Sequence, residues 1–124
     1  MRFNIYSGDS LIGWSALEHG DPPMGMASGT LHPSGSYSEV RATFRKLYSC
    51  GSDVPPDVWH EIESLALWAE SEGGKVVSDE VGVLDPSGEL PEEPPEVEVR
   101  CRDAEAYERH FPHHIRAYEE RFRS

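Results

Sequence analysis

Prolines and glycines interrupt this chain so often that only short elements fit between them. Ten prolines and eleven glycines are spread over its 124 residues, and adjacent prolines stand at residues 22–23, 55–56 and 94–95. Proline removes a backbone donor and glycine adopts turn conformations readily, so this spacing favours many turns over a helical bundle. The length predicts a single domain over residues 1–124 that can bury a hydrophobic core.

Alternation of apolar and polar residues predicts strands in four parts of the chain. The first part reads as a hairpin that turns near Gly8 and places Ile12, Trp14 and Ala16 on one face. The third part reads as a second hairpin, although its residues 64–72 also fit a continued helix. The four parts are residues 3–16, 24–33, 65–84 and 96–102.

Helical spacing of apolar residues predicts two main helices. The first follows Ser36 and Glu39, which match a capping box, and ends before Gly51, which suits a left-handed position. The second follows Asp103 and kinks or restarts at Pro112, because proline has no amide hydrogen to donate. We expect two apolar stripes to face the core, namely Tyr37, Val40, Phe44, Leu47 and Tyr48, and Tyr107, Phe111, Ile115, Tyr118 and Phe122.

Together these segments predict an α+β domain. About five or six strands, arranged as two hairpins plus single strands, should form one antiparallel sheet. The two main helices should pack on one face of that sheet. In this arrangement the C-terminal helix belongs to the core, and we expect Phe122 to be buried.

Two cysteines and the absence of long apolar runs indicate the compartment. The segment from residue 1 to residue 10 lacks the apolar stretch of a signal peptide, and no run is long enough to span a membrane. Cys50 and Cys101 are then expected as free thiols in the reducing cytoplasm.

The motif "HFPHH" raises the question of a metal site. His110 and His114 are four residues apart, which on an unbroken helix would let them share a metal ion. Pro112 lies between them and distorts that geometry, and no cysteine or carboxylate completes the ligand set. We therefore expect no metal and no cofactor, with these histidines exposed or capping a helix.

The stretch "EHGDPPMGMASG", residues 18–29, has two interpretations. Adjacent prolines favour an extended conformation at Asp21 and Pro22, and Gly25 and Gly29 permit close approach of other groups, which together indicate a rigid lead into a strand. The alternative is a binding loop around Asp21.

Negative charge is concentrated in one part of the chain. Residues 47–99 contain fourteen carboxylates and one base, Lys75, a net charge of −13 against −12 for the whole chain. Such a balance argues against binding to nucleic acid or anionic membranes, which need clustered lysine and arginine, and favours a basic protein partner. The candidate contact residues are Asp79, Glu80, Asp85, Glu89, Glu92, Glu93 and Glu96, with Trp14 and Trp68 as aromatic anchors.

Two motifs carry a resemblance to a known group of proteins. "IYSGDSLIGWSALEHGDPPMGMASG" and "HFPHHIRAYEERF" resemble segments of small uncharacterised bacterial proteins of the toxin-immunity type. The resemblance covers about the first thirty and the last fifteen residues, and it assigns no catalytic residues. It implies a protein that binds and neutralises a bacterial toxin.

The sequence thus favours a non-catalytic acidic domain, an immunity protein for a basic toxin such as a nuclease. One alternative is a small enzyme whose site combines the Asp21 loop with the C-terminal histidines. A third is a subunit that assembles only with itself. The sequence leaves monomer and homodimer equally open.

Overall fold

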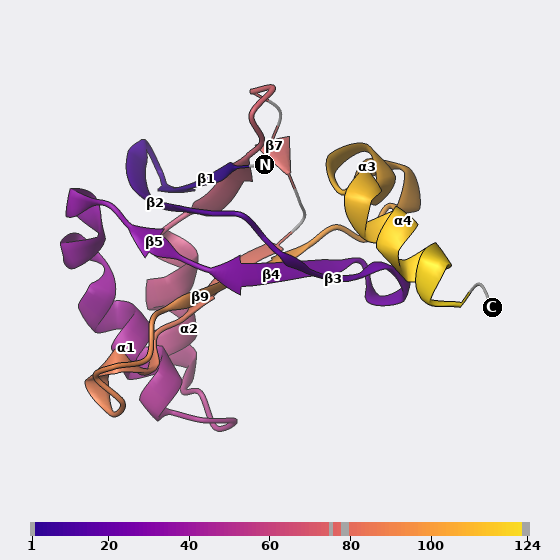
Figure 1. Cartoon of the computed structure of the whole chain (residues 1–124). Helices are drawn as coiled ribbons and strands as arrows, with labels where there is room; N and C mark the ends of the chain where they lie inside the picture. Colours follow the sequence, from indigo (N-terminus) through magenta and orange to yellow (C-terminus); the bar gives the residue numbers. More distant parts are fainter. Residues whose placement is uncertain (1, 75, 78–79, 123–124) are drawn as a thin grey trace.

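The computed structural model describes residues 2–74, 76–77 and 80–122, and over these residues the chain has the predicted α+β class. Its strands form two antiparallel sheets rather than the single sheet expected. The described helices lie in two separate places, α1 and α2 at one end and α3 and α4 at the other (Figure 1). None of these helices is long and apolar enough to cross a membrane.

The first sheet has five strands in the order β5-β2-β1-β6-β7. β1 and β2 form the predicted N-terminal hairpin, and β1 also pairs with β6, which lies far along the chain. The predicted hairpin around Gly73-Gly74 is confirmed as β6 and β7, so residues 67–70 are strand. The bounds are β1 Phe3–Ser7, β2 Ser10–Ser15, β5 His32–Pro33, β6 Leu67–Glu70 and β7 Val76–Val77.

The second sheet has four strands in the order β3-β4-β9-β8. In β9 the predicted alternation is confirmed, since Val97 and Val99 are buried while Glu98 and Arg100 lie on the partly exposed face. Among the described strands, β8 pairs only with β9 and forms one border of this sheet. The bounds are β3 His19–Asp21, β4 Met26–Thr30, β8 Glu80–Leu84 and β9 Glu96–Arg100.

A β-bulge changes which side chains of β2 face the core. Ile5 lies opposite Gly13 whereas Tyr6 lies opposite Leu11, so Ile12 is an extra residue in the ladder. Ile12 and Ser15 are buried, but Trp14 is only half-buried. The prediction that Ile12 and Trp14 share a face is therefore wrong, because the bulge reverses the alternation between them.

The helices begin differently from the sequence prediction. Ser36 lies within the 3₁₀ helix η2 (Gly35–Glu39), and Val40 precedes α1 (Arg41–Ser49) without a side-chain cap, so the predicted capping box is wrong. Gly51 has a φ of 62°, as predicted. The break at Pro112 is confirmed. The other helices are α2 Pro56–Ser64, α3 Ala104–His110 and α4 Pro112–Arg121.

One core joins both sheets, α1 and the α3–α4 pair. Phe3 and Ile5 from the first sheet, Val97 and Val99 from the second, and Phe111 between α3 and α4 are fully buried. The last residue of the predicted apolar stripe of the C-terminal helices does not reach the core: Phe122 is 68% exposed. The expectation of a buried Phe122 is thus wrong.

Candidate functional site

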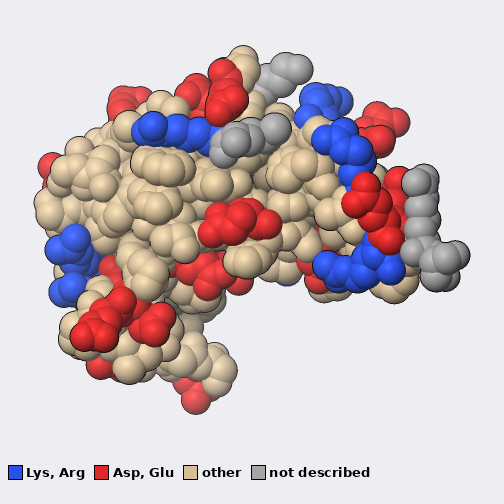
Figure 2. All heavy atoms as spheres, in the orientation of Figure 1, with Lys and Arg blue, Asp and Glu red and all other residues tan. Residues whose placement is uncertain are grey.

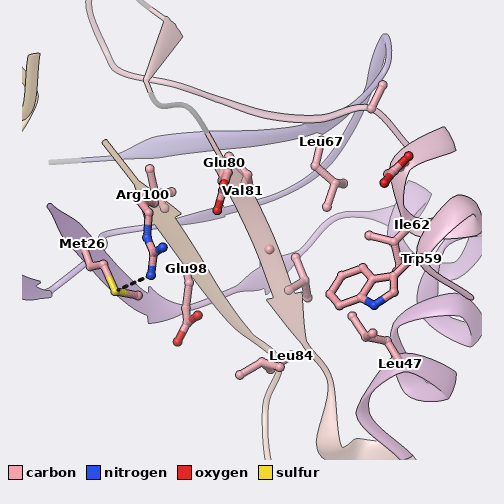
Figure 3. A pocket seen from close by; sticks show the side chains of 15 residues that line it. Met26, Leu47, Trp59, Ile62, Leu67, Glu80, Val81, Leu84, Glu98 and Arg100 are labelled. Atoms are coloured by element: carbon pink, nitrogen blue, oxygen red, sulfur yellow. Dashed lines mark hydrogen bonds between the residues drawn. The ribbon is translucent and has the colours of Figure 1, made fainter. Parts of the chain in front are cut away.

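An open groove of about 770 Å³ runs between helix α2 and the outer strand β8 of the second sheet (Figure 3). Its walls and floor come from segments that are distant in the sequence: α1, α2, β6 and three strands of the second sheet. The apolar side chains that line it are Met26, Leu47, Trp59, Ile62, Ala66, Leu67, Val81, Val83, Leu84 and Val99.

Trp59 reaches the groove because of its position on α2. Pro56 opens this helix, and Val58 is 2% exposed on its core-facing side. Successive residues are rotated by about 100° around the helix axis, so Trp59 does not lie on the core-facing side that carries Val58. Its side chain stays 48% exposed. Leu84 across the groove is 39% exposed. Large apolar side chains left in water within one concavity are typical of an interaction site.

The charged lining of the groove is mainly acidic. Glu63, Glu80 and Glu98 contribute three carboxylates and Arg100 one guanidinium, so the lining has a net charge of +1 − 3 = −2. Glu80 is paired with Arg102, whose Nη2 lies 2.8 Å from its Oε1. In the described part of the chain, Glu63 and Glu98 have no such ion pair.

The predicted acidic contact residues do not lie together. Glu80 lines the groove, and Glu96 is exposed on the same sheet, opposite Leu84 in the ladder. Glu89, Glu92 and Glu93 are exposed in the loop between β8 and β9. Asp79 lies outside the described residues.

Asp85 is unsuited to the surface role predicted for it. It is 1% exposed, and its Oδ2 accepts a hydrogen bond from the Tyr37 hydroxyl at 2.6 Å. Its Oδ1 accepts from the amide of Ser87 at 3.0 Å and from the Ser87 hydroxyl. Burial alone would raise the pKa of the Asp85 carboxyl, but the hydrogen bonds from Ser87 and Tyr37 outweigh it and hold that pKa below its usual range. Asp85 therefore anchors the loop to η2.

Basic side chains of α1 offset the acidic loop. Glu92 and Glu93 line a second, smaller hollow together with Arg41 and Arg45. The Nε of Arg45 also donates to the Ser87 hydroxyl at 3.2 Å. Figure 2 shows acidic atoms at the lower left, where Figure 1 places this loop, with basic atoms beside them. The field of the loop is thus weaker than its composition predicts.

The two predicted aromatic anchors are already engaged within the protein. The ring of Trp14 stacks on His32 with a centroid distance of 4.1 Å, and the Arg2 guanidinium lies 4.7 Å from its centroid. Trp68 stacks on Tyr6 at 4.3 Å and donates its indole N–H to the Gly8 carbonyl at 2.8 Å. Neither residue lines the groove between α2 and β8.

Trp59 is the aromatic residue that sequence reasoning missed. A signal for it exists, because Val58 and Ile62 are four residues apart and so define the core-facing side of a helix that excludes Trp59. The groove itself had no such signal. It depends on where α1, which contacts both α2 and β8, places these two elements, and this arrangement leaves no periodic pattern in the sequence.

The C-terminal histidines, which we expected to be exposed or to cap a helix, pack into the protein instead. His110 and His114 are each 7% exposed. The Nε2 of His114 lies 2.7 Å from the carbonyl oxygen of Leu17, a residue held at a φ of 44°. The buried Nδ1 of His113 has no hydrogen-bond partner among the described residues, and burial, followed by the neighbouring His114 and Arg116, lowers the pKa of His113. Among the described residues no three histidine, cysteine or carboxylate side chains are placed to hold a metal.

The structure does bring the Asp21 loop against these histidines. A Cβ added to Gly20 would collide with the ring of His114, and Asp21 itself is exposed at the end of β3. Asp21 is extended, but Pro22 starts the 3₁₀ helix η1 (Pro22–Met24), so the predicted extension ends one residue early. Neither hollow described above includes Asp21 or these histidines.

Comparisons with known proteins give no relative for this fold or site. No protein-family model matches the chain, and searches of curated proteins and of solved structures found no match either.

Proposed function

We propose that this chain is a non-catalytic acidic domain that binds a basic protein in the cytoplasm and neutralises it, as an immunity protein does for a toxin. The observation that carries the proposal is the groove between α2 and β8. Trp59 and Leu84 are held in water there, and three of the four charged groups around them are carboxylates.

Two properties of this groove support a protein partner. Exposed tryptophan and leucine supply affinity that salt does not screen, because their burial removes apolar surface from water. The carboxylates of Glu63 and Glu98, which form no ion pair within the described part of the chain, would speed the approach of a cationic surface. The resemblance of residues 5–29 and 110–122 to toxin-immunity proteins supplies the more specific part of the proposal.

Both cysteines are compatible with a reducing compartment. Cys50 is half-buried and Cys101 is buried, and neither forms a disulfide.

The test starts with recovery of the partner on a tagged form of the chain from a lysate of its own host. The recovered protein is then purified, and its toxic activity is measured with and without one equivalent of the chain. We expect a basic partner whose activity is abolished. An acidic partner, or an activity that the chain leaves unchanged, would contradict the proposal.

Matched charge variants locate the contact. Glu63→Gln with Glu98→Gln removes two charges from the groove, whereas Glu119→Gln with Glu120→Gln removes two from α4, where both residues are exposed. The groove variant should associate with the partner several-fold more slowly, since close charges dominate steering. The α4 variant should associate nearly as fast as wild type. Equal rates for both variants would exclude the groove as the electrostatic contact.

A further inference from the structure

The outer edge of β8 borders the groove, with β6 and α1 packed nearby. β8 is the last strand in its sheet, and within the described residues no backbone–backbone hydrogen bond joins Glu80–Leu84 to anything but β9. Alternate amides and carbonyls along an edge strand point away from the neighbouring strand. β8 therefore offers free donors and acceptors to an added strand.

The other described strand edges are much less suited to this. β5 has two residues, one of them Pro33, and β3 has three residues and runs directly into Pro22. β7 has two residues. Short edges and prolines are the usual protection against unwanted pairing, and β8, with five residues and no proline, lacks both.

The two faces of the sheet differ in chemistry along β8. Val83 lies on the buried side of the sheet and lines the groove together with Trp59 and Ile62 of α2, two side chains that are labelled in Figure 3. On the other side Gly82 lies directly opposite Glu98 in the ladder. Because Gly82 has no side chain, it leaves the carboxylate of Glu98 open to approach from the β8 edge.

From this arrangement we infer that the groove binds an extended basic segment of the partner as an added strand along β8. The inference rests on the proposed function and specifies its recognition mode. Successive side chains of a strand point to opposite faces. Apolar side chains of the segment would enter the space beside Trp59 and Ile62, and the alternate arginine or lysine side chains would cross Gly82 to reach Glu98.

A short synthetic peptide that alternates arginine with valine is the probe. Titrated into the ¹⁵N-labelled full chain, it should shift the amide signals of Glu80–Leu84 and the indole signal of Trp59. The same peptide with N-methyl groups on alternate residues cannot make the strand hydrogen bonds, so its affinity should fall by roughly tenfold or more. A peptide with glutamate in place of arginine should not bind.

Gly82→Arg provides the matched variant in the protein. A Cβ at Gly82 meets no atom within 4 Å, and the new guanidinium would pair with Glu98 and remove the target of the peptide's arginine. Gly35→Arg makes the same change of charge at a glycine that is equally uncrowded and lies outside the groove. Gly82→Arg should weaken peptide binding by roughly tenfold while Gly35→Arg changes it little.

Other outcomes separate this inference from the proposed function. If the peptide shifts signals of residues 85–95 instead of β8, or binds equally well when N-methylated, strand addition is wrong although an acidic contact surface survives. Failure of the peptide to bind at millimolar concentration also overturns strand addition. The proposed function is decided separately by neutralisation of the partner.

Discussion

At the scale of single residues, the hydrogen bond from Tyr37 to Asp85 fixes the loop that follows β8. Burial, followed by the bond to Asp85, raises the pKa of the Tyr37 hydroxyl far above its usual value, so it remains a donor throughout the neutral range. Tyr37→Phe should lower the free energy of unfolding by roughly 1.5–3 kcal/mol, because it leaves a buried carboxylate short of one donor. Urea unfolding at neutral pH measures this loss.

The loss from Tyr37→Phe should depend on pH with a definite sign. The pKa of Asp85 lies below its unfolded value of 3.8, so its ionised form stabilises the fold above that pH, and this contribution is lost as pH falls. The difference in the free energy of unfolding between wild type and Tyr37→Phe should therefore become smaller in acid. Tyr48→Phe is the control, since Tyr48 is half-buried and its hydroxyl has no hydrogen bond among the described residues. A difference in unfolding free energy that stays constant with pH would show that lost packing causes the destabilisation.

His113, which is half-buried, predicts a second dependence of stability on pH. Its pKa is lower in the folded chain than the unfolded value of 6.5, so the unfolded state takes up the proton first as pH falls. The melting temperature should decline from about pH 7.5 to about pH 5.5 and decline less steeply in His113→Phe, which cannot titrate. The exposed His60 serves as control, and His60→Gln should retain the wild-type slope. An unchanged slope in His113→Phe would assign the decline to other groups.

At the scale of elements, the C-terminal helices show where a periodic pattern stops being a guide. Phe111 is fully buried against Phe3 and Tyr107, with ring centroids 5.3 and 5.0 Å away, whereas Phe122 contacts Tyr118 and is 68% exposed. Phe111→Ala should cost roughly 3–5 kcal/mol of unfolding free energy. Phe122→Ala should change it by about 0.5 kcal/mol or less. Denaturant titration compares them, and equal costs would mean that α4 packs more closely against the protein.

The strands were more predictable than their assembly. Alternation located β9 and both hairpins, because each strand buries one face and repeats every second residue. The division into two sheets depends on β1 pairing with β6 and on β4 pairing with β9, contacts that span long stretches of sequence. The bulge at Ile12 likewise has no local signal, and it moved Trp14 off the core.

The candidate site was predictable in its charge and not in its position. Composition correctly marked residues 47–99 as acidic, but it could not show that Asp85 is buried or that Arg41 and Arg45 stand beside Glu92 and Glu93. Composition also gave no reason to place Trp59 and Glu98 in the same groove. These facts depend on which elements meet in space, and a count of charges along the chain contains no such information.

At the scale of the whole molecule, a net charge of −12 acts on folding and on binding with opposite signs. In the free chain the like charges repel, so added salt should raise the melting temperature by screening them. In association with a basic partner the same charges attract, so added salt should slow binding. Calorimetry of the free chain and stopped-flow mixing with the partner, both from about 20 to about 300 mM sodium chloride, measure the two effects.

A variant with four glutamates changed to glutamine tests the source of the repulsion; the four are Glu89, Glu92, Glu93 and Glu96. Salt should raise the melting temperature of this variant less than that of wild type, because four charges are removed from one loop and its neighbouring strand. The same variant should slow association only modestly, since Arg41 and Arg45 already offset Glu92 and Glu93. If salt instead lowers the melting temperature of the free chain, native ion pairs such as Arg102–Glu80 outweigh the repulsion. The negative charge of residues 47–99 must then be balanced by basic groups within the fold.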